Sequence, residues 1–137
     1  MEGRSQTILV AEDYESNRKL LALLLEHAQY EVHLATDGYA ALDRMLNGVF
    51  DAVIMDWDMP GLSGSKFLAL GQTLWLDTPV IMVSAHTIDP GEGIYQRAFA
   101  WLRKPYESQE LLEILQAAVQ TAAHRRWERS IAIPVHG

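Results

Sequence analysis

Short apolar runs alternate along the chain with segments in which apolar residues recur every three or four positions. The clearest runs are rich in Val and Ile and are bounded by polar or turn residues. Runs of this length suit buried strands and are too short for independent helices. The five predicted strands are Thr7–Ala11, Glu31–Ala35, Ala52–Met55, Val80–Val83 and Ala100–Leu102.

Four of the intervening segments carry an apolar stripe with helical spacing. Asn47-Gly48 is expected to cap the end of the second helix, and Ser108 to cap the start of the last one. The stripes are Leu20, Leu21, Leu24, Leu25 and Ala28; Ala41, Leu42, Met45 and Leu46; Phe67, Leu68 and Leu70; and Leu111, Leu112, Leu115, Ala118, Val119 and Ala122.

The segment from 86 to 97 is the least regular of those between the predicted strands. Because it contains Pro90, Gly91 and Gly93, we expect its helix to be short or to start late. A strand followed by a helix, five times over, is typical of an α/β fold: an open parallel sheet with helices on both faces. We assign residues 1–123 to one domain and residues 124–137 to a C-terminal helix extension or linker.

Composition narrows the functional classes. The chain has 137 residues and a net charge of −7, which disfavours direct nucleic-acid binding. It has no cysteine, so disulfides and thiolate metal sites are excluded. The sequence contains no apolar run long enough to cross a membrane and no hydrophobic signal-peptide core, so a cytoplasmic location is the simplest expectation.

Polar residues follow four of the predicted strands. Glu12 and Asp13 follow the first strand, Asp56 the third, Ser84 the fourth, and Lys104 comes soon after the fifth. Ligands of open α/β sheets bind beyond the carboxyl ends of the strands, so these side chains are expected to meet at one edge.

The chemistry of this set points to phosphoryl transfer. Clustered carboxylates repel one another unless a cation neutralises them, and a set of oxygen ligands suits a hard ion such as Mg2+. A nearby lysine can hold phosphoryl oxygens as a point donor. We therefore interpret the residues as a phosphoryl-transfer site with a carboxylate nucleophile.

The ordered motifs resemble the receiver domains of two-component response regulators, of the chemotaxis-regulator-like kind. The resemblance covers residues 7 to about 123, and its first motif is similar to receivers of hybrid kinases and phosphorelays. It implies a flavodoxin-like, doubly wound sheet of five strands in the order 2-1-3-4-5. The motifs are Glu12-Asp13-Tyr14-Glu15-Ser16-Asn17-Arg18-Lys19-Leu20-Leu21, Asp56-x-x-Met59-Pro60-x-x-x-Gly64, Ser84-Ala85 and Trp101-Leu102-x-Lys104-Pro105.

The resemblance also implies a role for each acidic residue. Asp56 would accept a phosphoryl group from a phosphohistidine on a sensor histidine kinase or a histidine phosphotransfer protein. Asp13 and Asp56 would bind Mg2+ directly, Glu12 directly or through water, and Asp58 through its main-chain carbonyl. Lys104 would hold a phosphoryl oxygen. The chain would then be a signalling receiver with only self-phosphorylation and slow autodephosphorylation chemistry.

The same resemblance implies that output depends on a conformational switch. Ser84 would donate a hydrogen bond to the modified site, and Trp101 would turn inward and reshape the face of the fourth helix and fifth strand. Asp58 and His86 occupy the positions that tune phosphoryl lifetime. The partner that binds this face would be a downstream protein or an output domain missing from this chain, and a homodimer is the further expectation.

This sequence departs from the usual pattern at the switch. Trp101 stands where Tyr or Phe is common, and Arg97 replaces a glycine, so the behaviour of the switch is left open. Two alternatives follow. A haloacid-dehalogenase-type phosphatase also has the fragment Asp56-Trp57-Asp58, but its nucleophile lies on the first strand, before the acidic pair. The second alternative is a binding module that keeps the receiver fold but works without phosphorylation, and constitutive partner binding by an Asp56→Asn variant would support it.

Overall fold

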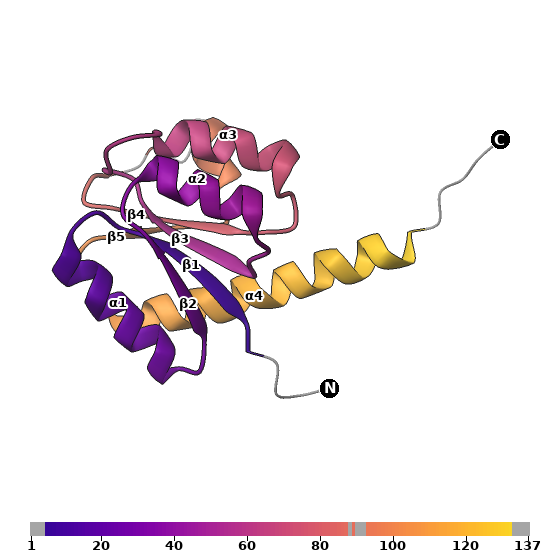
Figure 1. Ribbon diagram of the computed structural model, residues 1–137, viewed down its shortest axis with the longest axis horizontal. Helices are drawn as coiled ribbons and strands as arrows, with labels where there is room; N and C mark the ends of the chain where they lie inside the picture. The colour runs from indigo at the N-terminus through magenta and orange to yellow at the C-terminus, as the bar shows by residue number, and fades with distance from the viewer. Residues whose placement is uncertain (1–4, 88, 90–92, 133–137) are drawn as a thin grey trace.

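The computed structural model of the chain describes residues 5–87, 89 and 93–132. A parallel sheet with the order β2-β1-β3-β4-β5 forms its centre, as the sequence predicted (Figure 1). The strands are β1 (Thr7–Ala11), β2 (Glu31–Ala35), β3 (Ala52–Asp56), β4 (Val80–Ser84) and β5 (Ala100–Arg103).

The sheet is covered on both faces, which explains why its central strands are almost wholly apolar. Every residue of β3 and β4 is buried. In the register of these strands, Ile54 lies between Val10 of β1 and Ile81 of β4. Neighbouring residues of a strand face opposite sides, so each strand contributes to two separate cores.

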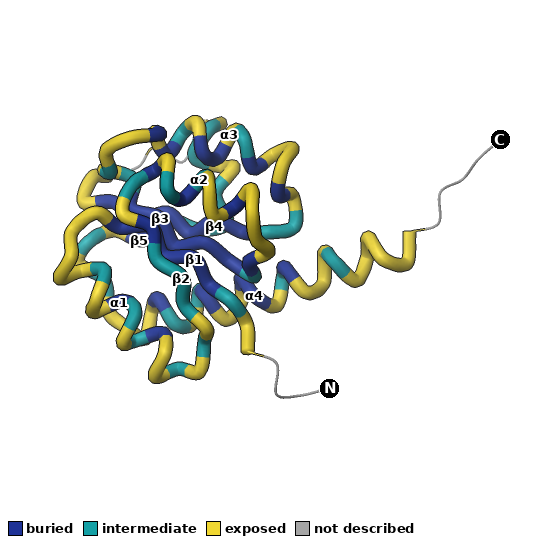
Figure 2. The backbone as a smooth tube through the Cα atoms, viewed as in Figure 1, coloured by how far each residue is buried: buried dark blue, intermediate teal, exposed yellow. Residues whose placement is uncertain are grey.

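The two cores lie on the two sides of the sheet (Figures 1 and 2). On one side α2 (Gly38–Asn47) and α3 (Gly64–Leu74) pack through Met45 and Phe67 against strand residues such as Val53. On the other side α1 (Glu15–His27) and α4 (Ser108–Ile131) pack through Leu25 and Leu115. The predicted apolar stripes are thus the buried faces of these helices.

Side-chain caps fix the starts of the two helices on the first side. Asp37 accepts a hydrogen bond from the backbone N–H of Ala40 at 2.7 Å, and Ser63 accepts one from Lys66 at 3.3 Å. The cap expected at Ser108 is wrong, because Ser108 is already the first helical residue and Glu107 precedes it without a side-chain cap. Gly48 follows α2 in an extended conformation and not in the left-handed one of a glycine cap.

The segment between β4 and β5 contains one short helix among its described residues. It is a 3-10 turn, η1 (Gly93–Arg97), which agrees with the expected short and late start. Pro90 and Gly91 lie outside the described residues, whereas Gly93 opens the turn.

The last helix is longer than its apolar stripe. The stripe ends at Ala122, yet α4 continues to Ile131 and projects beyond the sheet (Figure 1). Polar contacts hold the first part of this extension: Arg126 pairs with Asp51 at 2.6 Å, and Arg129 pairs with Asp77 at 2.6 Å. The chain therefore stays helical from residue 123 through Ile131.

Asp51 joins the start of the sheet to this helix, and its loss should destabilise the fold. Its carboxylate accepts hydrogen bonds from the backbone N–H of Thr7 at 2.7 Å and from Arg126 at 2.6 Å. We expect Asp51→Ala to lower the free energy of unfolding by about 1–2 kcal/mol, measured by urea denaturation. The exposed Glu26→Ala is the matched control, and an equal loss in both variants would contradict this assignment.

Candidate functional site

The carboxyl ends of the strands bring the predicted residues to one edge of the sheet. Glu12 and Asp13 follow β1, Asp56 is the last residue of β3, and Ser84 is the last residue of β4. Lys104 follows β5, and its backbone N–H donates to the carbonyl of Ser84 at 2.8 Å. All five residues therefore lie where parallel strands present their ligands.

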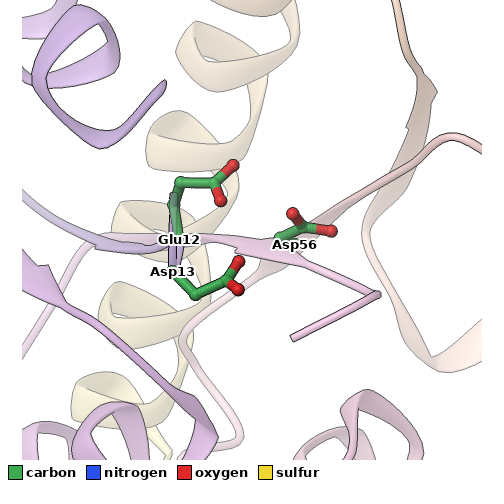
Figure 3. Close-up of side chains that lie close together, drawn as sticks. All are labelled: Glu12, Asp13 and Asp56. Carbon is green, nitrogen blue, oxygen red and sulfur yellow. The ribbon is translucent and has the colours of Figure 1, made fainter. Parts of the chain in front are cut away.

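Three carboxylates meet at this edge. One oxygen from each of Glu12, Asp13 and Asp56 lies within 4.8 Å of the others, and Figure 3 shows the three side chains converging. Glu12 and Asp56 are buried, with 3% and 7% of their surface exposed, whereas Asp13 is open to solvent. Two carboxylates are thus removed from water, and the third faces the side from which a ligand can enter.

Lys104 supplies positive charge to this group. Its ammonium donates a hydrogen bond to Asp56 Oδ2 at 2.9 Å and lies 3.6 Å from Glu12 Oε1. Burial lowers the pKa of Lys104, but its hydrogen bond to Asp56 and the charges of Asp56 and Glu12 raise that pKa overall. Lys104 is therefore a firmly protonated cation in the resting protein, and it has partners there before any phosphoryl group arrives.

The pKa of Glu12 is raised as well, which for a carboxyl group favours the neutral form. Burial is the main cause that raises its pKa, and the charge of Asp56 adds to this effect. The backbone N–H of Tyr14, which donates to Glu12 Oε2 at 3.0 Å, and the charge of Lys104 act against it. The site thus holds more negative charge than its single neighbouring ammonium can offset.

This donor set fits Mg2+. The converging atoms are all carboxylate oxygens, and a hard divalent cation would relieve their mutual repulsion. Glu12, Asp13 and Asp56 are the side chains that could hold it. The carboxylate of Asp58 is not part of this group among the described residues, and the expectation for Asp58 concerned its main-chain carbonyl.

Asp58 and His86 face each other at the site. The backbone N–H of Asp58 donates to Asp56 Oδ1 at 2.9 Å, so the second oxygen of Asp56 is also bound. The Asp58 carboxylate lies 3.4 Å from His86 Nε2, and both side chains are largely exposed. The two residues expected to tune phosphoryl lifetime are therefore in contact with each other.

Ser84 is buried, with 1% of its surface exposed. Its hydroxyl oxygen accepts a hydrogen bond from the backbone N–H of His86 at 3.0 Å. This bond uses the oxygen as an acceptor and leaves the hydroxyl hydrogen available for another partner.

Trp101 belongs to an aromatic cluster that also contains Trp57 and Tyr95. The ring centroids of Trp101 lie 5.0 Å from Trp57 and 5.1 Å from Tyr95, in edge-to-face arrangements. The indole N–H of Trp101 donates to the carbonyl of Tyr95 at 2.7 Å and so ties β5 to η1. The sequence analysis did not predict the contacts of Trp57 and Tyr95 with Trp101, because these contacts depend on the irregular segment before β5.

An apolar groove runs beside the carboxylates, between α1 and the start of α4. It has a volume of about 830 Å³ and reaches Asp56 and Lys104 at one end. Leu20 and Leu23, which line it from α1, expose 66% and 64% of their surface. The carboxylates and an exposed apolar surface are thus adjacent.

Comparisons with known proteins agree with this geometry. Residues 8–116 match the family model described as response regulator receiver domain. The chemotaxis response regulator CheY4 of Vibrio cholerae superposes with a TM-score of 0.76 at 31% identity, covering 84% of this chain and 99% of that chain. The response regulator TrrA of Thermotoga maritima, in complex with Mg2+-BeF, superposes with a TM-score of 0.77 at 28% identity, covering 82% and 98%.

Longer proteins contain similar sequences. The two-component response regulator ARR12 of Arabidopsis thaliana is 39% identical over 83% of this chain and 20% of its own length. The transcriptional regulatory protein DltR of Streptococcus agalactiae is 36% identical over 77% of this chain and 48% of its own length. The chain thus spans half or less of these relatives. Within its described residues, none of the helices has the length and apolar character needed to cross a membrane.

The resting contacts of Lys104 predict a cost when its charge is removed. Lys104→Met leaves the buried carboxylates of Asp56 and Glu12 without their cation, and we expect the free energy of unfolding to fall by about 1–3 kcal/mol without Mg2+. Adding Mg2+ should restore part of it, because the ion neutralises the same carboxylates. Urea denaturation with and without Mg2+ measures both effects. Lys66→Met, which removes an exposed cation from α3, should change neither value; an unchanged stability of Lys104→Met would contradict the pairing.

Proposed function

Because this chain belongs to the family of response regulator receiver domains, signalling domains that accept a phosphoryl group on an aspartate and bind Mg2+ at an acidic site, we propose that Asp56 is the acceptor. One observation carries the proposal. Asp56 is buried at the end of the central strand β3, and its two oxygens accept hydrogen bonds from Lys104 and from the backbone of Asp58. This arrangement orients the carboxylate and places a cation beside it.

The phosphoryl donor in this proposal is a phosphohistidine on a sensor histidine kinase or a histidine phosphotransfer protein. An oxygen of Asp56 attacks the phosphorus, a P–O bond forms, and the P–N bond breaks with its electron pair returning to the imidazole. Lys104 exchanges its contact with Asp56 for a phosphoryl oxygen. Glu12, Asp13 and Asp56, with the main-chain carbonyl of Asp58, would hold Mg2+, which would supply the remaining charge neutralisation.

The groove beside the site supports docking of that donor. A phosphohistidine must come within bonding distance of Asp56, so its protein has to cover the neighbouring surface. The exposed Leu20 and Leu23 provide apolar area for such a contact, next to Lys104. A cytoplasmic location is part of the same proposal, because kinases charged by ATP present their phosphohistidine there.

The proposed switch starts at Ser84. At rest its hydroxyl oxygen accepts from the backbone of His86, and after phosphorylation the hydroxyl would donate to the phosphoryl group. Movement at this point would be passed to Trp101 and to η1, which Trp101 holds through Tyr95. We propose that a downstream protein or an output domain of a longer protein reads this face, and that Asp58 and His86 set the lifetime of the phosphoryl group.

Phosphorylation by a small donor tests the central assignment. We expect acetyl phosphate with Mg2+ to add one phosphoryl group to the wild-type chain, detected by intact mass, and Asp56→Asn to remain unmodified. Asp43→Asn, an exposed aspartate of α2, is the matched control and should be modified like the wild type. Removal of Mg2+ should abolish the reaction.

The outcomes separate the remaining alternatives. Modification of Asp56→Asn would move the acceptor to another residue. A wild-type chain that takes no phosphoryl group from acetyl phosphate or from a histidine kinase, yet binds a partner constitutively, would favour the phosphorylation-independent receiver. The dehalogenase-type alternative is set aside because the chain belongs to the receiver family.

The indole of Trp101 gives a second prediction. Trp101→Phe keeps an aromatic ring but loses the N–H that donates to Tyr95, so η1 loses one tether to β5. We expect hydrogen exchange across Gly93–Arg97 to speed up about fivefold, the equivalent of a hydrogen bond worth about 1 kcal/mol. Trp57→Phe removes an indole from the same cluster without removing that bond. Equal acceleration in both variants would assign the tether to ring packing.

A further inference from the structure

Arg18 of α1 reaches back to the backbone of the acidic pair. Its Nη1 donates hydrogen bonds to the carbonyl of Glu12 at 2.9 Å and to the carbonyl of Asp13 at 3.2 Å. Arg18 is half-buried and lies one turn into the helix that follows these residues. Its guanidinium therefore touches the main chain of both residues and not their carboxylates.

The backbone held by Arg18 is the short link between β1 and α1. Upstream, the N–H of Glu12 donates to the carbonyl of Ala35 in β2 at 3.0 Å. Downstream, α1 starts after Tyr14, whose side chain makes no capping hydrogen bond. The two hydrogen bonds of Arg18 thus tie the carbonyls of this link to the first turns of α1.

The direction of this link decides where two carboxylates point. Glu12 and Asp13 are adjacent in sequence, and their like charges would push the two side chains apart. Both must nevertheless face Asp56 at the same time, as they do in Figure 3. A backbone fixed at both carbonyls limits the orientations that the side chains can take.

We propose that Arg18 is a positioning residue for the Mg2+ site, which it serves by fixing the main chain of Glu12 and Asp13. The inference rests on the proposed function of these carboxylates as ligands. Groups behind the ligands of a metal site orient those ligands, and their loss costs about 10- to 100-fold in metal affinity. Because Arg18 contacts the backbone of the ligand residues and not their carboxylates, we expect a loss of Mg2+ affinity near the lower end of that range.

An electrostatic role and a positioning role of Arg18 predict opposite changes in Mg2+ affinity when its side chain is replaced. Removing a cation beside a Mg2+ site reduces electrostatic repulsion, so an effect of charge alone would strengthen Mg2+ binding. Loss of the two hydrogen bonds that hold the link would instead weaken it. The sign of the change therefore distinguishes a positioning residue from a nearby charge.

The test is titration of the full chain with Mg2+ by isothermal calorimetry, at a temperature well below the melting temperature of every variant. We expect Arg18→Met to bind Mg2+ about tenfold more weakly than the wild type. Arg18→Lys, which keeps a donor and the charge, should recover part of the affinity. Lys19→Met is the matched control, because Lys19 is the next residue of α1, is exposed, and within the described part of the chain forms its ion pair with Glu15.

Each outcome decides the proposal. Weaker binding in Arg18→Met, with Lys19→Met unchanged or tighter, supports it. Affinity of Arg18→Met equal to or above that of the wild type, or an equal loss in Lys19→Met, overturns it. Asp13→Asn separates this inference from the site itself: if Asp13→Asn weakens Mg2+ binding and Arg18→Met does not, only the role of Arg18 fails. If neither variant changes the affinity, the proposed metal site fails and the role of Arg18 fails with it.

Discussion

The ammonium group of Lys104 lies among carboxylates that outnumber it, and this imbalance of charge organises the site. Asp56 and Glu12 are buried and close to Lys104, while Asp13 completes the acidic group from the solvent side. A buried carboxylate is costly unless a cation stands beside it, so the two ion pairs of Lys104, with Asp56 and with Glu12, offset part of that cost in the resting protein. The negative charge that remains favours binding of a divalent cation.

The sheet places these groups because its strands are buried on both faces and end at a common edge. The apolar runs predicted all five strands, and the family resemblance implied their order. Strands β3, β4 and β5 each extend one residue further than predicted, to Asp56, Ser84 and Arg103. Apolar patterning stops at the first polar residue, whereas the backbone ladder continues through it. Two of those extra residues are Asp56 and Ser84, so functional side chains sit where apolar patterning stops being informative.

The contacts that sequence reasoning missed share a physical reason. Arg18 acts on the backbone behind the acidic pair, Trp101 donates through its indole to Tyr95, and Arg126 meets Asp51 across a distance of 75 residues in sequence. None of these contacts produces a periodic pattern in the sequence, because each joins two polar groups that come together only when the chain folds. The site carboxylates were predictable because their position after a strand repeats along the sequence; their supports do not repeat.

The contacts of the last helix fix its rotation about its own axis as well as its direction. From Ser108 to Ile131 the helix is continuous, and Arg126 and Arg129 bind it to the loops at the amino ends of the strands. An α-helix turns by about 100° for each residue. A polypeptide joined to this helix in helical continuity would therefore be carried around the axis with every residue inserted or removed, and would face its original side again only after two full turns. The two ion pairs thus determine which side of the domain such a polypeptide would face.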